Sequence, residues 1–414
     1  MPPSRSAEAF ITQHIDTHSD TALVHLSELV RTPSDNPPGD CKAIALLAKT
    51  QLEGLGFTVE TYQVPEATVT AQGMRHVTNL VVRERFGEGP VVALNAHGDV
   101  VPPGSGWSVD PYSAHREGNW LYGRGAAVSK SDFVSYAMAL HALKHSGLAL
   151  KGSVELHFTF DEEIGGLLGP GWLLAQQIVA PDYVICAGFS HNVIVAHNGC
   201  LHLELSLQGK SAHAAVPDSG VDAIKAAGII INALYRYSDH LAQRPSTTPG
   251  IDHPTLVVGL IEGGINTNVV ADRVTLRVDR RITPEENPEE VEAEITALLQ
   301  HEAKRYTGLT IDIRRILLAR PLSPTPESKR WANIIAQRAA QQLGSPVSDS
   351  AGSPLYTDAR LYAERGIPTI MFGAGPVSLL EANGHRADER VPIDTLAISA
   401  KAIALGIIDL LGYA

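Results

Sequence analysis

The stretch CLHLELSLQG, Cys200–Gly209, separates two kinds of sequence pattern. Leucine occupies every second position from 201 to 207, which predicts an antiparallel strand with one buried face. Before this stretch, strand patterns at 89–99, 152–163 and 182–188 alternate with helical patterns at 41–57, 134–147 and 172–179. Such alternation predicts an α/β sheet with parallel strands. Residues 7–31 also carry one helical pattern.

The half-exposed pattern continues to about residue 315. Strand patterns at 253–264, 268–282 and 309–317 are interleaved with helical patterns at 220–242 and 287–306, which indicates an α+β unit. A helical pattern at 327–344 and an apolar strand pattern at 367–375 then restore the α/β character. We therefore predict an α/β domain of residues 1–198 and 316–414, interrupted by an inserted α+β domain of residues 199–315.

Composition narrows the class of protein. Of the 414 residues, 44% are apolar and 19% are charged, as in an ordinary globular protein with a sizeable core. The net charge of −12 argues against a nucleic-acid partner. Three cysteines are too few for a disulfide framework, the N-terminus lacks a signal-peptide pattern, and no apolar run reaches the ~18 residues of a membrane span. These features predict a cytoplasmic protein without membrane contact.

Several polar groups follow predicted strands, where α/β sheets carry their ligand sites. A carboxylate two residues from an imidazole can fix its tautomer, as metal-bound histidines require. Adjacent carboxylates can divide the tasks of metal ligand and general base. The motifs are VVALNAHGDV with His97 and Asp99, LHFTFDEEIGG with Glu162 and Glu163, QGKSAHAAVP with His213, and ANGHRADERV with His385.

Their order resembles one family along nearly the whole chain. The stretches that carry the resemblance are PSDNPPG (33–39), NAHGDVVPPGSGWSVDPYSAHREGNWLYGRGA (95–126), DEEIGG (161–166), GKSAHAAVPDSGVDAI (209–224), GGINTNVV (263–270), YTDAR (356–360) and GHRADERV (384–391). Together they resemble the aminoacylase, carboxypeptidase G and succinyl-diaminopimelate desuccinylase family of dinuclear zinc amidohydrolases. The resemblance implies a zinc-aminopeptidase-like α/β domain with an inserted ferredoxin-like lid domain that usually dimerises.

The resemblance also implies roles for individual residues. By position, His97 matches a ligand of one metal and Asp99 the residue that orients it. Glu162 matches the general base, Glu163 a ligand of the other metal, and His385 the histidine of that metal. His213 matches a lid histidine that reaches the partner subunit's site and supports the oxyanion. The positions that match substrate contacts are Asn268, Arg281 and Thr357.

Two metal ligands of the family have no counterpart here. The family usually has Gly-Arg-Gly-Ala-x-Asp-Met-Lys-Gly, whose aspartate bridges both metals. This chain has GRGAAVSKS, with Val128 at the aspartate and Lys130 retained. Relatives also place an acid about where Gly188 stands. Glu163 is then the remaining carboxylate ligand, so we expect at most one divalent metal per subunit, zinc or manganese, or no metal at all.

Replacement ligands and other mechanisms remain open at this level. Asp132 and His191 lie near the lost positions, although a helix cap and a solvated loop are the simpler interpretations. His97, Glu163 and His385 could form a mononuclear site. Without metal, Glu162 and Lys130 could perform acid–base chemistry, and a nucleophile made of Lys130 with a neighbouring serine is conceivable.

These residues predict a hydrolase of a C–N bond, amide or amidine-like, in a small carboxylate-bearing amino-acid derivative. Arg281 and Asn268 would bind the carboxylate, Glu162, His213 and Lys130 would be catalytic, and the inserted domain would form a homodimer. The alternatives are a ligand-binding protein that lost its chemistry and a metal-independent acid–base enzyme.

Overall fold

The computed structural model describes residues 5–413, which divide into two compact units. The first comprises residues 5–195, 324–351 and 357–413, and the second comprises residues 196–323 and 352–356. The second unit contains the residues 199–315 of the expected inserted domain, extends beyond them to residue 323, and includes a short segment near residue 354.

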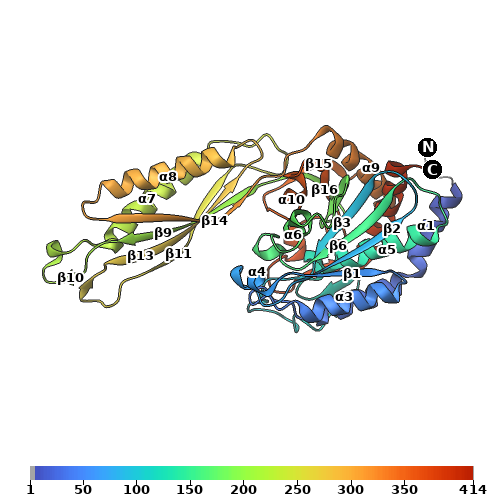
Figure 1. Cartoon of the computed structure of the whole chain (residues 1–414), viewed down its shortest axis with the longest axis horizontal. Helices are drawn as coiled ribbons and strands as arrows, with labels where there is room; N and C mark the ends of the chain where they lie inside the picture. Colours follow the sequence, from blue (N-terminus) through green and yellow to red (C-terminus); the bar gives the residue numbers. More distant parts are fainter. Residues whose placement is uncertain (1–4, 414) are drawn as a thin grey trace. The chain divides into compact units, whose positions relative to one another are not determined.

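A mixed eight-stranded sheet forms the centre of the first unit (Figure 1). Its four inner strands are parallel neighbours, as the α/β pattern predicts, and antiparallel strands extend it on both sides. In spatial order the strands are β1 (Val59–Gln63), β2 (Thr78–Arg85), β6 (Ser153–Thr159), β3 (Val91–His97), β7 (Tyr183–Cys186), β16 (Thr369–Met371), β8 (Asn192–His197) and β15 (Ser348–Ser353).

Helix α5 (Ser131–His145) is the centre of the helical packing in this unit. It is buried from Ser131 to Leu143 and contacts β3 and β6 as well as other helices. Helix α12 (Asp394–Leu411) packs against α5 and α9 (Pro326–Leu343). The other helices are α1 (Arg5–Thr17), α2 (Ser19–Arg31), α3 (Lys42–Gly54), α4 (Glu66–Ala71), α6 (Pro170–Ala175), α10 (Ala359–Ala363) and α11 (Leu379–Ala382).

The helical pattern at residues 7–31 becomes two helices rather than one. The α1 and α2 helices meet at His18, whose φ and ψ of −99° and 11° interrupt the first helix. A small antiparallel sheet of β4 (His115–Glu117), β5 (Trp120–Tyr122) and β17 (Arg390–Pro392) joins the segment before α5 to the loop after α11.

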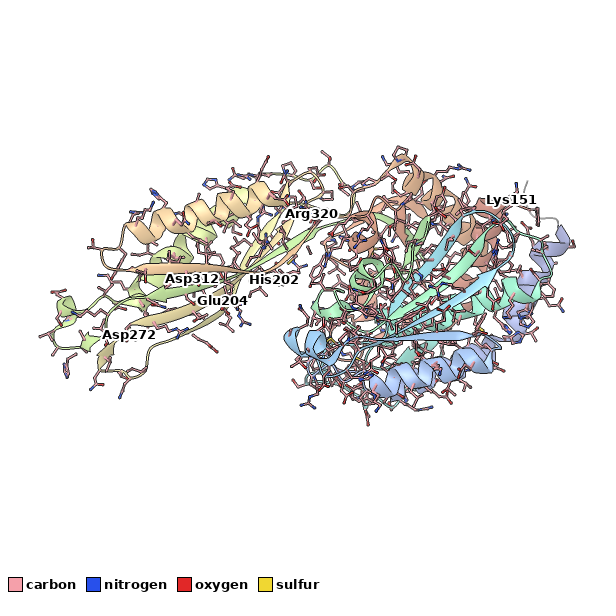
Figure 2. The ribbon with its side chains drawn as sticks, in the orientation of Figure 1. Lys151, His202, Glu204, Asp272, Asp312 and Arg320 are labelled. Atoms are coloured by element: carbon pink, nitrogen blue, oxygen red, sulfur yellow. The ribbon has the colours of Figure 1, made fainter. Side chains whose placement is uncertain are left out.

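The second unit is a four-stranded antiparallel sheet with two helices. Its strand order is β11 (Thr255–Gly263), β13 (Arg273–Ile282), β9 (Gly199–Gln208) and β14 (Thr310–Ala319). The alternating leucines of β9 are buried against α7 (Ala223–Leu241) and α8 (Pro288–Lys304). His202 and Glu204 occupy the intervening positions of β9 (Figure 2). A two-stranded ribbon, β10 (Ala212–His213) with β12 (Val269–Val270), completes the unit.

Candidate active site

Four inner strands of the large sheet bring the candidate residues to one edge. The strands β6, β3, β7 and β16 are parallel neighbours, so their carboxyl ends lie at the same edge of the sheet. His97 is the last residue of β3, and Glu162 and Glu163 form a single 3-10 turn directly after β6. Gly188 follows β7 by two residues.

The carboxylate of Asp99 holds the two glutamates in place. Its Oδ1 accepts the backbone N–H of Glu162, and its Oδ2 accepts that of Glu163, both at 3.1 Å. The amide of Asn36 donates to the same Oδ2 at 3.0 Å. Asp99 therefore joins the end of β3 to the turn after β6, a role beyond the histidine contact that the family resemblance implies.

His97 faces Glu162 from the neighbouring strand. The Nδ1 atom of His97 lies 3.0 Å from the carbonyl oxygen of Asp99 and 3.4 Å from its carboxylate. Its Nε2 atom lies 3.9 Å from Oε2 of Glu162. Burial opposes protonation of His97, but the charges of Glu162 and Asp99 raise its pKa well above the ordinary value. Burial raises the pKa of Glu162 to about 8, with further increases from the neighbouring acids.

Glu163 and His385 meet without forming a hydrogen bond. Oε1 of Glu163 lies 3.2 Å from Nε2 of His385, yet this buried oxygen has no hydrogen-bond partner among the described residues. Ligand atoms of His97, Glu162 and Glu163 also lie within 4.8 Å of one another. His97, Glu162 and Glu163 are therefore a set of three possible ligands for one divalent ion, whereas His385 contacts Glu163 without joining that set.

The two positions that lack the family's acids differ in the room that surrounds them. Val128 packs partly buried on the core, and its Cγ2 lies 3.6 Å from where a Cβ on Gly384 would be. A Cβ on Gly188 would approach the backbone nitrogen of Phe372 to 2.8 Å. Backbone cannot yield as a flexible side chain can, so an acid at position 188 requires the adjoining strand to move. A side chain at position 188 therefore has little room in this structure.

The carboxylate of Asp132 accepts hydrogen bonds from backbone N–H groups at the edge of the large sheet. Its buried carboxylate accepts the N–H of Gly188 at 3.1 Å and that of Ala374 at 2.7 Å. Burial raises the pKa of Asp132 well above the ordinary value, against these two hydrogen bonds. Within residues 5–413, neither Asp132 nor His191 belongs to a set of three possible ligands within 4.8 Å. The structure thus gives no support to either residue as a replacement ligand.

Lys130 points to the end of a helix. Its ammonium is fully buried and donates to the carbonyl oxygens of Leu29 and Thr32, each at 3.0 Å. These carbonyls belong to the last turn of α2 and the residue after it, where cations are favoured. Burial lowers the pKa of Lys130 to about 8. The two bonds favour a structural role over the catalytic role that the sequence indicated.

The hydroxyls of the two serines beside Lys130 form hydrogen bonds with backbone groups. The hydroxyl of Ser129 accepts the N–H of His97 and donates to its carbonyl, at 3.1 and 3.0 Å. The hydroxyl of Ser131 donates to the carbonyl of Ala374 at 3.3 Å. Neither hydroxyl bonds to the Lys130 ammonium, so a serine–lysine nucleophile is not assembled in this structure.

Two buried acids near the site were missed by sequence analysis. Asp358, next to Thr357, is 5% exposed, and burial together with the charge of Glu162 raises its pKa well above the ordinary value. Glu389 forms a buried ion pair with Arg124 and accepts the N–H groups of Ala127 and Val128, each at 3.1 Å. Glu389 lies in the GHRADERV motif, so its place in that motif was the available signal.

The remaining candidates lie mostly in the second unit. His213 pairs with Val269 across the β10–β12 ribbon, and the N–H of Ala214 donates to the carbonyl of Asn268 at 3.0 Å, so His213 and Asn268 are neighbours. Arg281 binds Asp279 with two nitrogens, at 3.0 and 3.1 Å, and stacks over the ring of Tyr356. Thr357, in the first unit, accepts the N–H of Ala359.

The sequence also matches a described family. A profile of "Peptidase family M20/M25/M40" matches residues 93–408. The chain belongs to this peptidase family. The M20/M25/M40 relatives include the succinyl-diaminopimelate desuccinylase of Gluconacetobacter diazotrophicus, 30% identical over 92% of this chain and 95% of that protein. The acetylornithine deacetylase of Myxococcus xanthus is 28% identical over 86% of this chain and 90% of that protein.

Solved M20 structures share the fold. A metallo-carboxypeptidase from Sulfolobus solfataricus has a TM-score of 0.75 and 19% identity, with 94% of this chain and 99% of that chain covered. A dinuclear metal-binding peptidase from Bacillus subtilis has a TM-score of 0.69 and 17% identity, with 96% and 100% covered. With these hydrolase relatives, the M20 chain is itself a hydrolase. None of its described helices combines the length and apolar character of a membrane span.

Proposed function

We propose that this protein hydrolyses the amide bond of a small, carboxylate-bearing N-acyl amino acid, with at most one divalent ion in its active site. The observation that carries the proposal is the preserved group of Glu162, His97 and Glu163, whose ligand atoms lie within 4.8 Å. Relatives named as a desuccinylase and a deacetylase remove acyl groups from amino-acid derivatives, which supports this substrate class.

Glu163, His385 and His97 are the residues that would hold the ion. A bound divalent ion supplies Lewis acidity, which polarises the substrate carbonyl and lowers the pKa of water. The loss of acids at Val128 and Gly188 supports a single ion, because two dications would share one carboxylate ligand, Glu163. The same loss removes the bridging ligand that holds two ions about 3.5–4 Å apart in two-metal sites.

Glu162 is the proposed general base. Its carboxylate lies 3.9 Å from His97, and its raised pKa of about 8 favours proton exchange near neutral pH. It would take a proton from the attacking water and deliver it to the leaving amine. Asp99 would hold the Glu162 backbone through one carboxylate oxygen, so that the base stays aimed at the site.

Residues of the second unit are proposed to bind substrate and the partner subunit. Arg281 keeps N–H donors beyond its two bonds to Asp279, and a guanidinium suits a substrate carboxylate. His213 and Asn268 are exposed neighbours. Ile261 on β11 and Ile224 on α7 are exposed apolar residues of the same unit, 57% and 51% accessible. These features support a homodimer formed through this unit, with His213 acting across it.

The alternative function is ligand binding without turnover, and one experiment separates the two. Purified protein is supplied with zinc or manganese and screened against N-succinyl and N-acetyl amino acids, with amine release as the readout. We expect turnover by the unmodified protein and none by Glu162→Gln, while calorimetry shows that Glu162→Gln still binds the substrate. The matched control Glu53→Gln changes an exposed acid, 51% accessible, and keeps activity. Binding by both proteins without amine release from any substrate would favour the alternative.

A further inference from the structure

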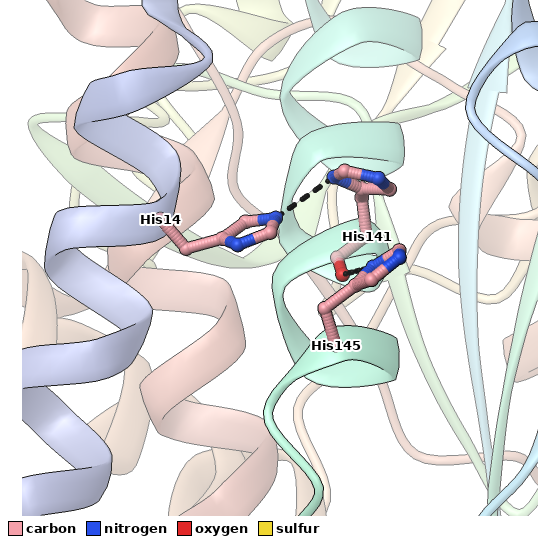
Figure 3. A group of neighbouring side chains, drawn as sticks. All are labelled: His14, His141 and His145. Carbon is pink, nitrogen blue, oxygen red and sulfur yellow. Dashed lines mark hydrogen bonds between the residues drawn. The ribbon is translucent and has the colours of Figure 1, made fainter.

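A cluster of histidines joins two helices away from the candidate active site. His14 lies on α1, and His141 and His145 lie on α5 (Figure 3). His14 Nε2 is 2.9 Å from His141 Nδ1, and the ring centroids of His141 and His145 are 4.3 Å apart. His18, one turn beyond His14, stacks on the His14 ring at 4.4 Å. Four imidazoles therefore meet where α1 contacts α5.

Hydrogen bonds orient His145 as a metal ligand would be oriented. Its Nδ1 lies 2.9 Å from the backbone carbonyl of His141, which can only accept, so Nδ1 carries the hydrogen. The neutral ring then has its lone pair on Nε2. A bond from the other ring nitrogen to a carbonyl is the usual support of a metal-bound histidine. His18 is held in the same way by the carbonyl of His14, at 2.7 Å.

The ring nitrogens of the cluster lie close enough together to converge on one ion. Ligand nitrogens of His14, His141 and His145 all lie within 4.8 Å of one another. Imidazole nitrogens about 2.0–2.1 Å from a tetrahedral zinc ion lie roughly 3.3–3.4 Å apart, so the rings would have to shift by a few tenths of an ångström. The contact between His14 and His141 is already 2.9 Å. Burial, followed by the neighbouring imidazoles, lowers the pKa of His141 to about 3, so its ring is neutral and able to coordinate at neutral pH.

We propose that His14, His141 and His145 form a second metal site, which takes a late first-row transition dication such as Zn²⁺, Ni²⁺ or Cu²⁺. An all-imidazole set selects these ions over Mg²⁺ and Ca²⁺, which prefer oxygen ligands. The ion replaces the N–H···N bond between His14 and His141. The ring that donates this bond moves its hydrogen to its other nitrogen, so the site gains no charge besides that of the ion.

This site is separate from the candidate active site on the same helix. Helix α5 begins at Ser131, which bonds to Ala374 at the edge of the large sheet, whereas His141 lies ten residues further along. Ten residues of helix span about 15 Å at 1.5 Å per residue. The ion would tie the first helix of the described chain to the most buried helix of the first unit, and binding would stabilise that contact by mass action.

Zinc binding to variants of the full-length protein tests this proposal. Chelator-treated protein carrying Glu163→Gln, which disables the candidate active site, is dialysed against Zn²⁺ and its bound metal is counted. We expect Glu163→Gln to bind one zinc ion per chain. The double variant Glu163→Gln/His145→Gln should bind this ion at least about tenfold more weakly, because even a residue that only orients a ligand contributes about 10–100-fold to metal affinity.

A control variant and a crystallographic measurement accompany the zinc titration. Glu163→Gln/His240→Gln changes an exposed histidine that, like His145, lies in the last turn of a helix, and it should bind zinc like Glu163→Gln. Crystals soaked in Ni²⁺ should show an anomalous peak between His14, His141 and His145. Equal zinc binding with and without His145, or a soaked crystal without that peak, would overturn the proposal.

Discussion

Asp99 accepts the backbone N–H of Glu162 on one carboxylate oxygen and that of Glu163 on the other, each at 3.1 Å. One buried side chain thus positions both the proposed base and a proposed metal ligand. The same side chain lies 3.4 Å from the ring of His97. Asp99 therefore contacts all three members of the group His97, Glu162 and Glu163.

Replacing Asp99 with asparagine should loosen both glutamates. An amide has one acceptor oxygen, so one of the two partly buried N–H groups loses its partner, at a cost of about 1 kcal/mol in unfolding free energy. Metal affinity at the candidate site should fall about 10–100-fold. Denaturant unfolding and zinc titration measure the two effects. The control is Asp182→Asn. Asp182 is an exposed carboxylate that accepts the backbone N–H of Val91, the first residue of β3, and its replacement should change metal affinity little.

Alanine at Gly188 should destabilise the protein. The added Cβ meets the nitrogen of Phe372 at 2.8 Å, and such overpacking costs about 1–3 kcal/mol. Gly228 in α7 offers the opposite case, because a Cβ there meets nothing within 4 Å and alanine is the better helix former. Gly228→Ala should raise the unfolding free energy by about 0.5–1 kcal/mol. A neutral Gly188→Ala variant would show that position 188 has room for a side chain.

Lys130 should make stability depend on pH. Burial lowers its pKa to about 8 in the folded protein, against 10.5 for an unperturbed lysine. Between these values the unfolded chain holds more protons, so the lysine's contribution to folding becomes more favourable as pH rises. The unfolding free energy of the wild type minus that of Lys130→Met should therefore increase from about pH 8 to 10.5. A difference that is constant over this range would contradict the buried position of the ammonium.

A mixed dimer should reveal whether His213 acts across subunits. One chain carries His213→Ala and the other carries Glu162→Gln, and each homodimer should be inactive. In the mixed dimer one active site combines an intact Glu162 with the other chain's His213, so about half of the wild-type activity per dimer should return. Activity measured after mixing and refolding checks this. Failure to regain activity, or a monomer by light scattering, would contradict the dimer.

The strand ends were the predictable part of the site. The chain positions of His97, Glu162 and Glu163 follow from apolar strand patterns, because parallel strands of one sheet end at the same edge. Strand β9 and helix α7 also agree with their patterns to within a few residues. The spacing of apolar residues along the sequence indicates which side chains are buried. These elements are stabilised mainly by the burial of those side chains.

The directions of polar side chains were not predictable. Lys130 keeps its place in the motif, but its ammonium turns to the carbonyls of Leu29 and Thr32, about 100 residues earlier in the chain. Asp132 likewise bonds to Gly188 and Ala374 from distant segments. Such bonds depend on tertiary contacts that no local pattern encodes. The break at His18 was missed because α1 and α2 carry similar apolar periodicity on both sides of it.

The most direct test of the account is the number of metal ions at the candidate active site. Crystals grown with excess zinc, measured at the zinc absorption edge, locate each ion and distinguish this site from the histidine cluster on α1 and α5. A site for one ion should give at most one anomalous peak beside Glu163 and none near Val128 or Gly188. Two peaks about 3.5–4 Å apart beside Glu163, the spacing of a two-metal centre, would contradict it.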